Sequence, residues 1–167
     1  MEISQYMDVL EQKLECSFDV TRNYSINGFQ YDLFAEYYLR NESYVLVKKA
    51  VVYAFENNEY CLIKYYKNLN KISYKNYIYN LIQSIESVVK PSNEHMSSII
   101  TGVIVTDGIL NEDLENIIEA VNRFKYNKGF AFGFKGWADI RLVLVSLNEG
   151  LIATNKKGKE VSKVYSI

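Results

Sequence analysis

Histidine, cysteine and proline are scarce in this chain of 167 residues, which holds one histidine (His95), two cysteines (Cys16 and Cys61) and one proline. A closed zinc site takes four Cys or His ligands at short paired spacings, and the sequence has no such set. A Ser-His-Asp or Cys-His catalytic system would depend on His95 alone. That histidine stands in a polar stretch after Pro91, so we expect a solvated loop residue. We expect both cysteines to be small core residues.

Neither sign of charge dominates, because 20 acidic residues stand against 19 basic residues and leave a net charge of -1. This balance excludes a polycation that coats nucleic acid and excludes an acidic tail, although it allows a local basic patch. No apolar run reaches the roughly 18 residues of a membrane-spanning helix. The first residues, Met-Glu-Ile-Ser-Gln, have no basic segment followed by an apolar one. We therefore expect no signal peptide, no membrane contact and a cytoplasmic location.

The remaining composition is that of a soluble globular protein, with 49% hydrophobic and 23% charged residues. The length is close to that of one average domain, so we predict a single domain over 1–167. Tyrosine occurs 15 times and is enriched at the centres of protein interfaces. An AT-rich genome produces the same excess, so tyrosine alone does not indicate a binding surface.

Three segments carry the three- and four-residue apolar steps of amphipathic helices. The predicted helices are 2–17, 73–90 and 111–123. In the second, Ser73 can cap the start and Lys90-Pro91 ends the helix. In the third, Asn111 can cap the start.

The other segments alternate apolar and polar residues or are rich in β-branched residues, as strands are. The predicted strands are 29–38, 44–56, 59–67, 98–106, 129–134, 140–147, 151–154 and 160–166. Residues 18–27 are less clear and are compatible with a short strand before the turn at Asn27-Gly28. The fold class is therefore α+β. We predict a mainly antiparallel sheet of about seven strands with three helices packed on it, in the order α-β-β-β-α-β-α-β-β-β-β.

The Asn57-Asn58 dipeptide suggests a two-residue turn, because asparagine enters the left-handed region more readily than most residues. That turn would pair 44–56 with 59–67 and would place Glu56 opposite Glu59. Two facing carboxylates repel, and a bound cation or a general acid/base pairing would explain them. The alternative is a polar tip whose two carboxylates point into water.

A basic and aromatic stretch lies between residues 123 and 137. Single-stranded nucleic acid binds where bases contact phosphates and aromatic rings stack on nucleobases. The alternative, which we favour, places Phe130, Phe132 and Phe134 on one strand face that points into the core. The candidate contact residues are Arg123, Lys125, Lys128, Lys135 and Trp137.

The element order of the first half, α-β-β-β-α-β, resembles the core of the restriction-endonuclease-like fold. Such nucleases hold Mg²⁺ with an Asp on one strand and an Asp/Glu-x-Lys motif on the next. Here Leu62 stands two residues before Lys64, where the motif has a carboxylate. The spacing of Asp32 and Glu59 does not match the motif. The nearest local match is Asp139-Ile140-Arg141, which has Arg in place of the motif's Lys. The resemblance therefore implies a degenerate, inactive domain at most.

Several short segments together resemble a small uncharacterised α+β family of prokaryotes, which is a domain of unknown function. They are Tyr31-Asp32-Leu33-Phe34-Ala35, the Glu56 to Glu59 segment, Phe124-Lys125-Tyr126-Asn127-Lys128, Gly136-Trp137 and Asn155-Lys156-Lys157-Gly158-Lys159. The resemblance covers most of the chain and implies no activity, cofactor or site.

The leading functional hypothesis is a non-enzymatic domain that binds a protein partner or itself, with no cofactor and no metal. It is favoured because nucleophile, metal and phosphate motifs are missing from the sequence. A nucleic-acid-binding or degenerate nuclease-like domain is the alternative. A third hypothesis is an enzyme for a small molecule that uses Asp32, Glu59 or Asp139.

Overall fold

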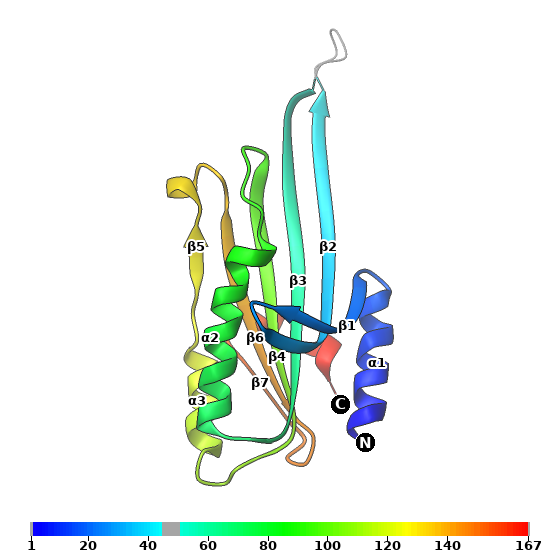
Figure 1. Cartoon of the computed structure of the whole chain (residues 1–167), viewed down its shortest axis with the longest axis vertical. Helices are drawn as coiled ribbons and strands as arrows, with labels where there is room; N and C mark the ends of the chain where they lie inside the picture. The colour runs from blue at the N-terminus through cyan, green and yellow to red at the C-terminus, as the bar shows by residue number, and fades with distance from the viewer. Residues whose placement is uncertain (1, 45–50, 167) are drawn as a thin grey trace.

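A long mixed β-sheet forms the centre of the computed structural model, which describes residues 2–44 and 51–166 (Figure 1). It has seven strands in the order β1-β2-β3-β4-β6-β5, and β7 also pairs with β6. Strands β3, β4 and β6 run parallel to one another, and the other pairs are antiparallel. The strands are β1 (Asp19–Ile26), β2 (Phe29–Tyr44), β3 (Val51–Leu69), β4 (His95–Ile109), β5 (Asn127–Gly129), β6 (Trp137–Ser146) and β7 (Leu151–Thr154). The predicted α+β class and the mostly antiparallel sheet are confirmed.

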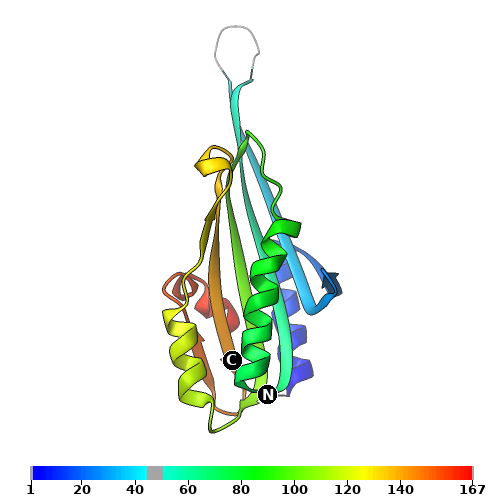
Figure 2. The same cartoon turned by 60° about the vertical axis from the view of Figure 1, so that its left-hand side comes forward.

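The helices cover both faces of the sheet (Figures 1 and 2). One face packs against α2 (Lys71–Val88) and α3 (Leu114–Arg123). The other packs against α1 (Ile3–Glu15) and the C-terminal 3₁₀ turns η2 (Gly158–Glu160) and η3 (Ser162–Tyr165). Because both faces of the central parallel strands are covered, they are almost continuously apolar.

The three helices match the predicted ranges to within a few residues, but their first turns differ from the prediction. The side chain of Asn70, not that of Ser73, caps α2, since its Oδ1 accepts a hydrogen bond from the Ser73 amide at 2.8 Å. Helix α3 starts at Leu114, and its N-cap residue Asp113 makes no side-chain cap hydrogen bond. The predicted turn at Asn27-Gly28 is confirmed, with φ angles of 51° and 81°.

The predicted hairpin around Asn57-Asn58 is wrong. Strand β3 runs straight through both asparagines, and its antiparallel partner is β2. The residues between β2 and β3, which include part of the predicted strand 44–56, lie outside the described residues. Pairing with a strand on each side holds these asparagines in the extended conformation, which overrides their local turn preference.

Two predicted strands near the C-terminus are turns. The segment 129–134 contains the 3₁₀ turn η1 (Ala131–Gly133), in which φ is 48° at Ala131 and 55° at Phe132. The segment 160–166 begins at the last residue of η2 and contains η3, which carries Tyr165 into the core against α1. The observed order is therefore α-β-β-β-α-β-α-β-β-β, and strand β4 continues through Asp107-Gly108 to Ile109.

Candidate functional site

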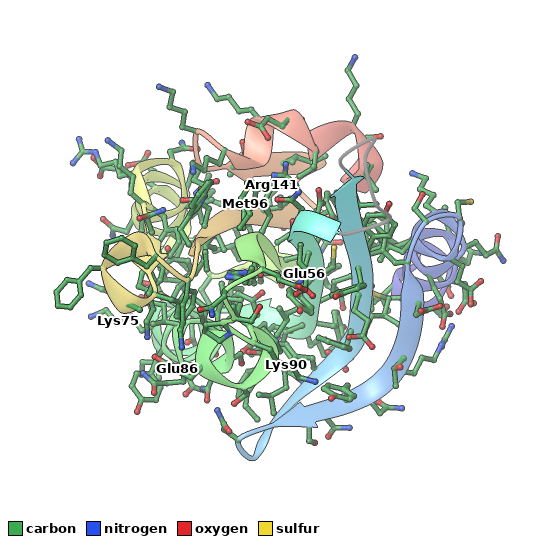
Figure 3. All side chains as sticks on the ribbon, turned by 90° about the horizontal axis from the view of Figure 1, so that it is seen from above. Glu56, Lys75, Glu86, Lys90, Met96 and Arg141 are labelled. Atoms are coloured by element: carbon green, nitrogen blue, oxygen red, sulfur yellow. The ribbon has the colours of Figure 1, made fainter. Side chains whose placement is uncertain are left out.

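The carboxylates of Glu56 and Glu59 do not form a pair. Both residues lie on β3, three positions apart, so their side chains leave opposite faces of the sheet. The hydroxyl of Tyr38 donates a hydrogen bond to Glu56. On the other face, the guanidinium of Arg141 (Figure 3) donates to Glu59 at 3.2 Å and to Glu160 at 3.0 Å. The predicted hairpin register, which set Glu56 opposite Glu59, is therefore wrong, and the two carboxylates do not face each other.

The two aspartates singled out from the sequence have structural partners. Asp32 accepts a hydrogen bond from the Tyr65 amide at 2.7 Å and lies 3.4 Å from the Lys64 ammonium. Asp139 forms an ion pair with Lys157 and accepts a hydrogen bond from Asn127 at 2.8 Å. Burial raises the pKa of Asp139, but the hydrogen bonds from Lys157 and Asn127, together with the charges of Lys157 and Arg141, outweigh that effect and hold the pKa below its ordinary value of 3.8. Across residues 2–44 and 51–166, no group of three His, Cys, Asp or Glu side chains could hold a metal ion.

The histidine is buried, so the prediction of a solvated loop residue is wrong. His95 begins β4 and is 3% exposed, with Nδ1 2.6 Å from the carbonyl oxygen of Lys135 and Nε2 2.9 Å from the hydroxyl of Ser98. A carbonyl oxygen only accepts, so Nδ1 carries a proton and donates it. The histidine thus anchors the loop before β6 to the start of β4.

The two cysteines differ from each other. Cys61 is buried in β3, and burial raises the pKa of its thiol to about 11, as expected for an inert core residue. Cys16 is exposed at the end of α1, so the prediction of a core residue is wrong there.

The aromatic loop, defined here as residues 130–137, exposes two of its three phenylalanines. Phe130 is buried, but Phe132 is 102% exposed and Phe134 is 86% exposed. The favoured prediction, that all three point into the core, is wrong because the left-handed backbone at residues 131–133 breaks the strand alternation. Trp137 and Met96 are also exposed at this end of the sheet, and both Phe rings point into solvent.

The structure does not bring the five predicted contact residues together. Arg123 pairs with Glu119 on the same helix, and Lys128 pairs with Glu86 on α2. Lys128, Lys135 and Trp137 lie near one another around the aromatic loop, because β5 pairs with β6 at Gly129 and Trp137 and the Lys135 amide donates to the carbonyl oxygen of Phe130. Lys125 is separate from them and lines a pocket near β7.

The hairpin of β2 and β3 extends beyond the rest of the sheet (Figures 1 and 2). Strand β1 pairs with β2 only as far as Asp19 opposite Glu36, whereas β2 continues to Tyr44 with β3 as its only strand partner among residues 2–44 and 51–166. Residues 37–44 therefore form an open edge, the term used below for this segment. The sequence did not indicate it, because the predicted turn at Asn57-Asn58 assigned these strands to the wrong partners.

The backbone direction along the open edge follows from one hydrogen bond. The amide of Glu56 donates to the carbonyl oxygen of Glu94 at 2.8 Å, on the side of β4. Because successive backbone groups of a strand alternate in direction, Glu56 and its β2 partner Arg40 form a non-hydrogen-bonded pair. The N–H and C=O of Arg40 consequently point away from β3, and those of Glu42 do the same.

Comparison with known proteins places the chain in one family. Residues 2–167 match the family model described as "Domain of unknown function (DUF8052)", and the chain belongs to this family. No curated protein and no solved structure matches the chain. The family resemblance inferred from short motifs is thus supported at the level of a domain of unknown function, whereas the resemblance to restriction endonucleases is not. In the described parts of the chain, no helix is long and apolar enough to cross a membrane.

Proposed function

We propose that this domain is a protein-interaction module that pairs with a second copy of itself along the open edge of β2. The observation that carries the proposal is that β1 begins at Asp19, opposite Glu36. Within the described residues, the backbone of residues 37–44 therefore has a neighbouring strand on the side of β3 only. A strand edge with unpaired N–H and C=O groups is a template for another strand.

The start of the open edge offers apolar as well as hydrogen-bonding surface. Tyr37 and Leu39 are 40% and 39% exposed, and Tyr38 is 58% exposed. Proteins that avoid edge pairing shorten or bulge their edge strands, or cover them. Here β2 is 16 residues long and outlasts its neighbour β1, which has 8, and the register shift against β3, between Ser43 and Tyr44, falls at the last residue of the open edge.

A second copy complements this edge because of its sequence. A two-fold axis through Asn41 would run the two β2 strands antiparallel, and each Arg40 would stand opposite the other copy's Glu42. Opposite charges directly across an antiparallel pair are favourable, and like charges are unfavourable. A shift of the axis to Arg40 or to Glu42 would set like charges opposite one another. Charge therefore selects the register centred on Asn41.

The pairing is expected to be weak and concentration-dependent. A strand of about seven residues buries less than the roughly 800 Å² per partner of a standard interface. Sedimentation velocity over a wide range of protein concentrations should therefore show reversible monomer–dimer exchange.

Two variants at one position separate the backbone contribution from the side chain. Arg40→Pro removes an amide that points to the open edge and leaves the hydrogen bonds to β3 in place, so dimer formation should be lost. Arg40→Ala keeps the amide and should retain measurable dimer. Equal dimerisation of the two variants would contradict pairing through this edge.

A charge exchange tests the register. Glu42→Arg would put like charges opposite at two symmetric positions and should weaken the dimer about tenfold, since each such cross-strand pair contributes roughly 0.2–1 kcal/mol. The double variant Arg40→Glu/Glu42→Arg restores opposite charges and should recover the affinity. A monomer at every concentration would overturn the proposal. The proposal would also be overturned if the double variant Phe132→Ala/Phe134→Ala lost the dimer while Arg40→Pro kept it.

A further inference from the structure

A pocket of ≈ 390 Å³ lies between the connection from α3 to β5 and the segment that follows β7. The first segment contributes residues 124–127, and the second contributes residues 155–157. Asp139 and Ile140 of β6 also line it. A cavity of this volume is in the range of small-molecule sites in proteins.

One buried side chain fixes the two walls of the pocket relative to each other. Asn155 is 2% exposed, and its Nδ2 donates to the carbonyl oxygens of Phe124 at 3.3 Å and Ile140 at 3.0 Å. Its Oδ1 accepts from the amides of Leu142 at 3.0 Å and Gly158 at 2.8 Å. The pocket is thus preformed, because all four hydrogen bonds of this amide hold its walls.

The pocket combines an apolar wall with an excess of positive charge. Phe124 and Tyr126 supply the apolar part, and three lysines stand against one carboxylate, that of Asp139. Asp139 is already engaged by Lys157. Among the ion pairs found within the described residues, none involves the other two lysines, Lys125 and Lys156.

From this geometry we infer that the pocket binds a small organic anion: a flat ring that lies against the apolar wall and carries a phosphate or carboxylate group met by Lys125 and Lys156. Lysine recognises such groups as a point charge on a flexible stem, so no fixed bidentate geometry is required. The site is separate from the open edge of β2, and the inference does not depend on the proposed self-association.

The test uses 1-naphthyl phosphate, which carries both the ring and the anion, beside 1-naphthoate as the carboxylate form. Neutral 1-naphthol supplies the ring alone, and inorganic phosphate supplies the anion alone. Titration calorimetry gives the affinities, and shifts of the amide resonances of Asn127 and Gly158 locate the site. We expect at least one of the two ring anions to bind about tenfold more tightly than either part alone, which corresponds to about 1.4 kcal/mol.

Matched lysine variants show whether the pocket is responsible. Lys125→Glu/Lys156→Glu should weaken binding of the ring anion about tenfold or more. Lys75→Glu changes an exposed lysine on α2, outside the pocket, and should leave the affinity unchanged. Asp139→Asn removes the one carboxylate and releases Lys157, so it should strengthen binding, an effect that simple loss of structure would not produce.

Three results would overturn the inference. The first is no binding of either ring anion. The second is equal binding of 1-naphthol and 1-naphthyl phosphate, which would make the pocket merely apolar. The third is an equal loss of affinity in Lys75→Glu and in the double variant, which would indicate nonspecific attraction to surface charge.

Discussion

The hydroxyl of Tyr6 donates a hydrogen bond of 2.8 Å to the main-chain carbonyl oxygen of Tyr165, which joins the first helix to the last turn of the chain. Both residues are buried, at 3% and 2% exposure. The two residues are 159 positions apart in the sequence. Their hydrogen bond therefore connects the two ends of the chain on the face of the sheet that α1, η2 and η3 cover.

Removal of that donor should lower stability. Tyr6→Phe keeps the ring and leaves the buried carbonyl oxygen of Tyr165 without its partner, at a cost of about 1–3 kcal/mol. Urea unfolding measures the change in free energy of unfolding. Tyr79→Phe, at a 64% exposed tyrosine of α2, is the control and should have no effect. Equal stability of Tyr6→Phe and wild type would show that the contact does not hold α1 to the C-terminal turn.

The closest approach of α2 to the sheet depends on Gly102. A Cβ at this position of β4 would lie 2.4 Å from Leu81 Cδ2 and 3.0 Å from the Tyr77 hydroxyl. Gly102→Ala should therefore force α2 away and cost about 1–3 kcal/mol. Gly129→Ala is the matched control, because its Cβ would meet no atom closer than 3.7 Å. Thermal unfolding measures the melting temperatures of both variants. Equal melting temperatures for Gly102→Ala and Gly129→Ala would contradict the tight contact between α2 and the sheet.

Mutation of two neighbouring asparagines of β3 should change the free energy of unfolding in opposite directions. Asn58 is 4% exposed, and its Oδ1 has no hydrogen-bond partner within the described residues. Asn58→Leu removes this unpaired polar atom and should raise the free energy of unfolding by about 1 kcal/mol. Asn57→Leu loses the 2.6 Å hydrogen bond from the Ser97 hydroxyl and should lower it. Destabilisation by Asn58→Leu would show that the amide has an essential partner.

The ion pair between Asp139 and Lys157 should contribute to stability only above acidic pH. The pKa of Asp139 is lower in the folded chain than its ordinary value of 3.8, so the folded state favours the ionised carboxylate. The contribution is present in full above about pH 5 and disappears as the pH falls through the lowered pKa. The stability difference between wild type and Asp139→Asn should be about 0.5–1 kcal/mol near neutral pH.

Chemical denaturation at a series of pH values measures this difference. It should stay constant at neutral and mildly acidic pH and shrink below about pH 4. A difference that does not change with pH would show that the carboxylate charge has no role. Lys163→Gln is the control, because this exposed lysine takes part in none of the ion pairs found within the described residues.

The helices could be predicted from the sequence because their amphipathic pattern is local. The stripe of Leu10 and Leu14 in α1, for example, is buried as the periodicity indicates. The nearly continuous β-branched run within 98–106 correctly indicated a strand buried on both faces. In these segments the local preference and the tertiary environment agree.

The open edge and the exposed aromatic loop could not be predicted, because they depend on where strands end and which strands pair. Asn57-Asn58 has a real turn preference, yet two neighbouring strands keep it extended. The alternation of Phe130, Phe132 and Phe134 is typical of a strand, but left-handed backbone at Ala131 and Phe132 breaks it. The open edge depends on the pairing of Asp19 with Glu36, which no local pattern encodes.

The central claim, that a second copy pairs along β2, is tested most directly by sedimentation velocity on Arg40→Pro and Arg40→Ala beside the wild type. We predict a wild-type protein whose sedimentation coefficient rises with concentration toward that of a dimer, a weaker but measurable rise for Arg40→Ala and a monomer for Arg40→Pro. A wild type that stays monomeric, or an Arg40→Pro variant that dimerises as the wild type does, would contradict it.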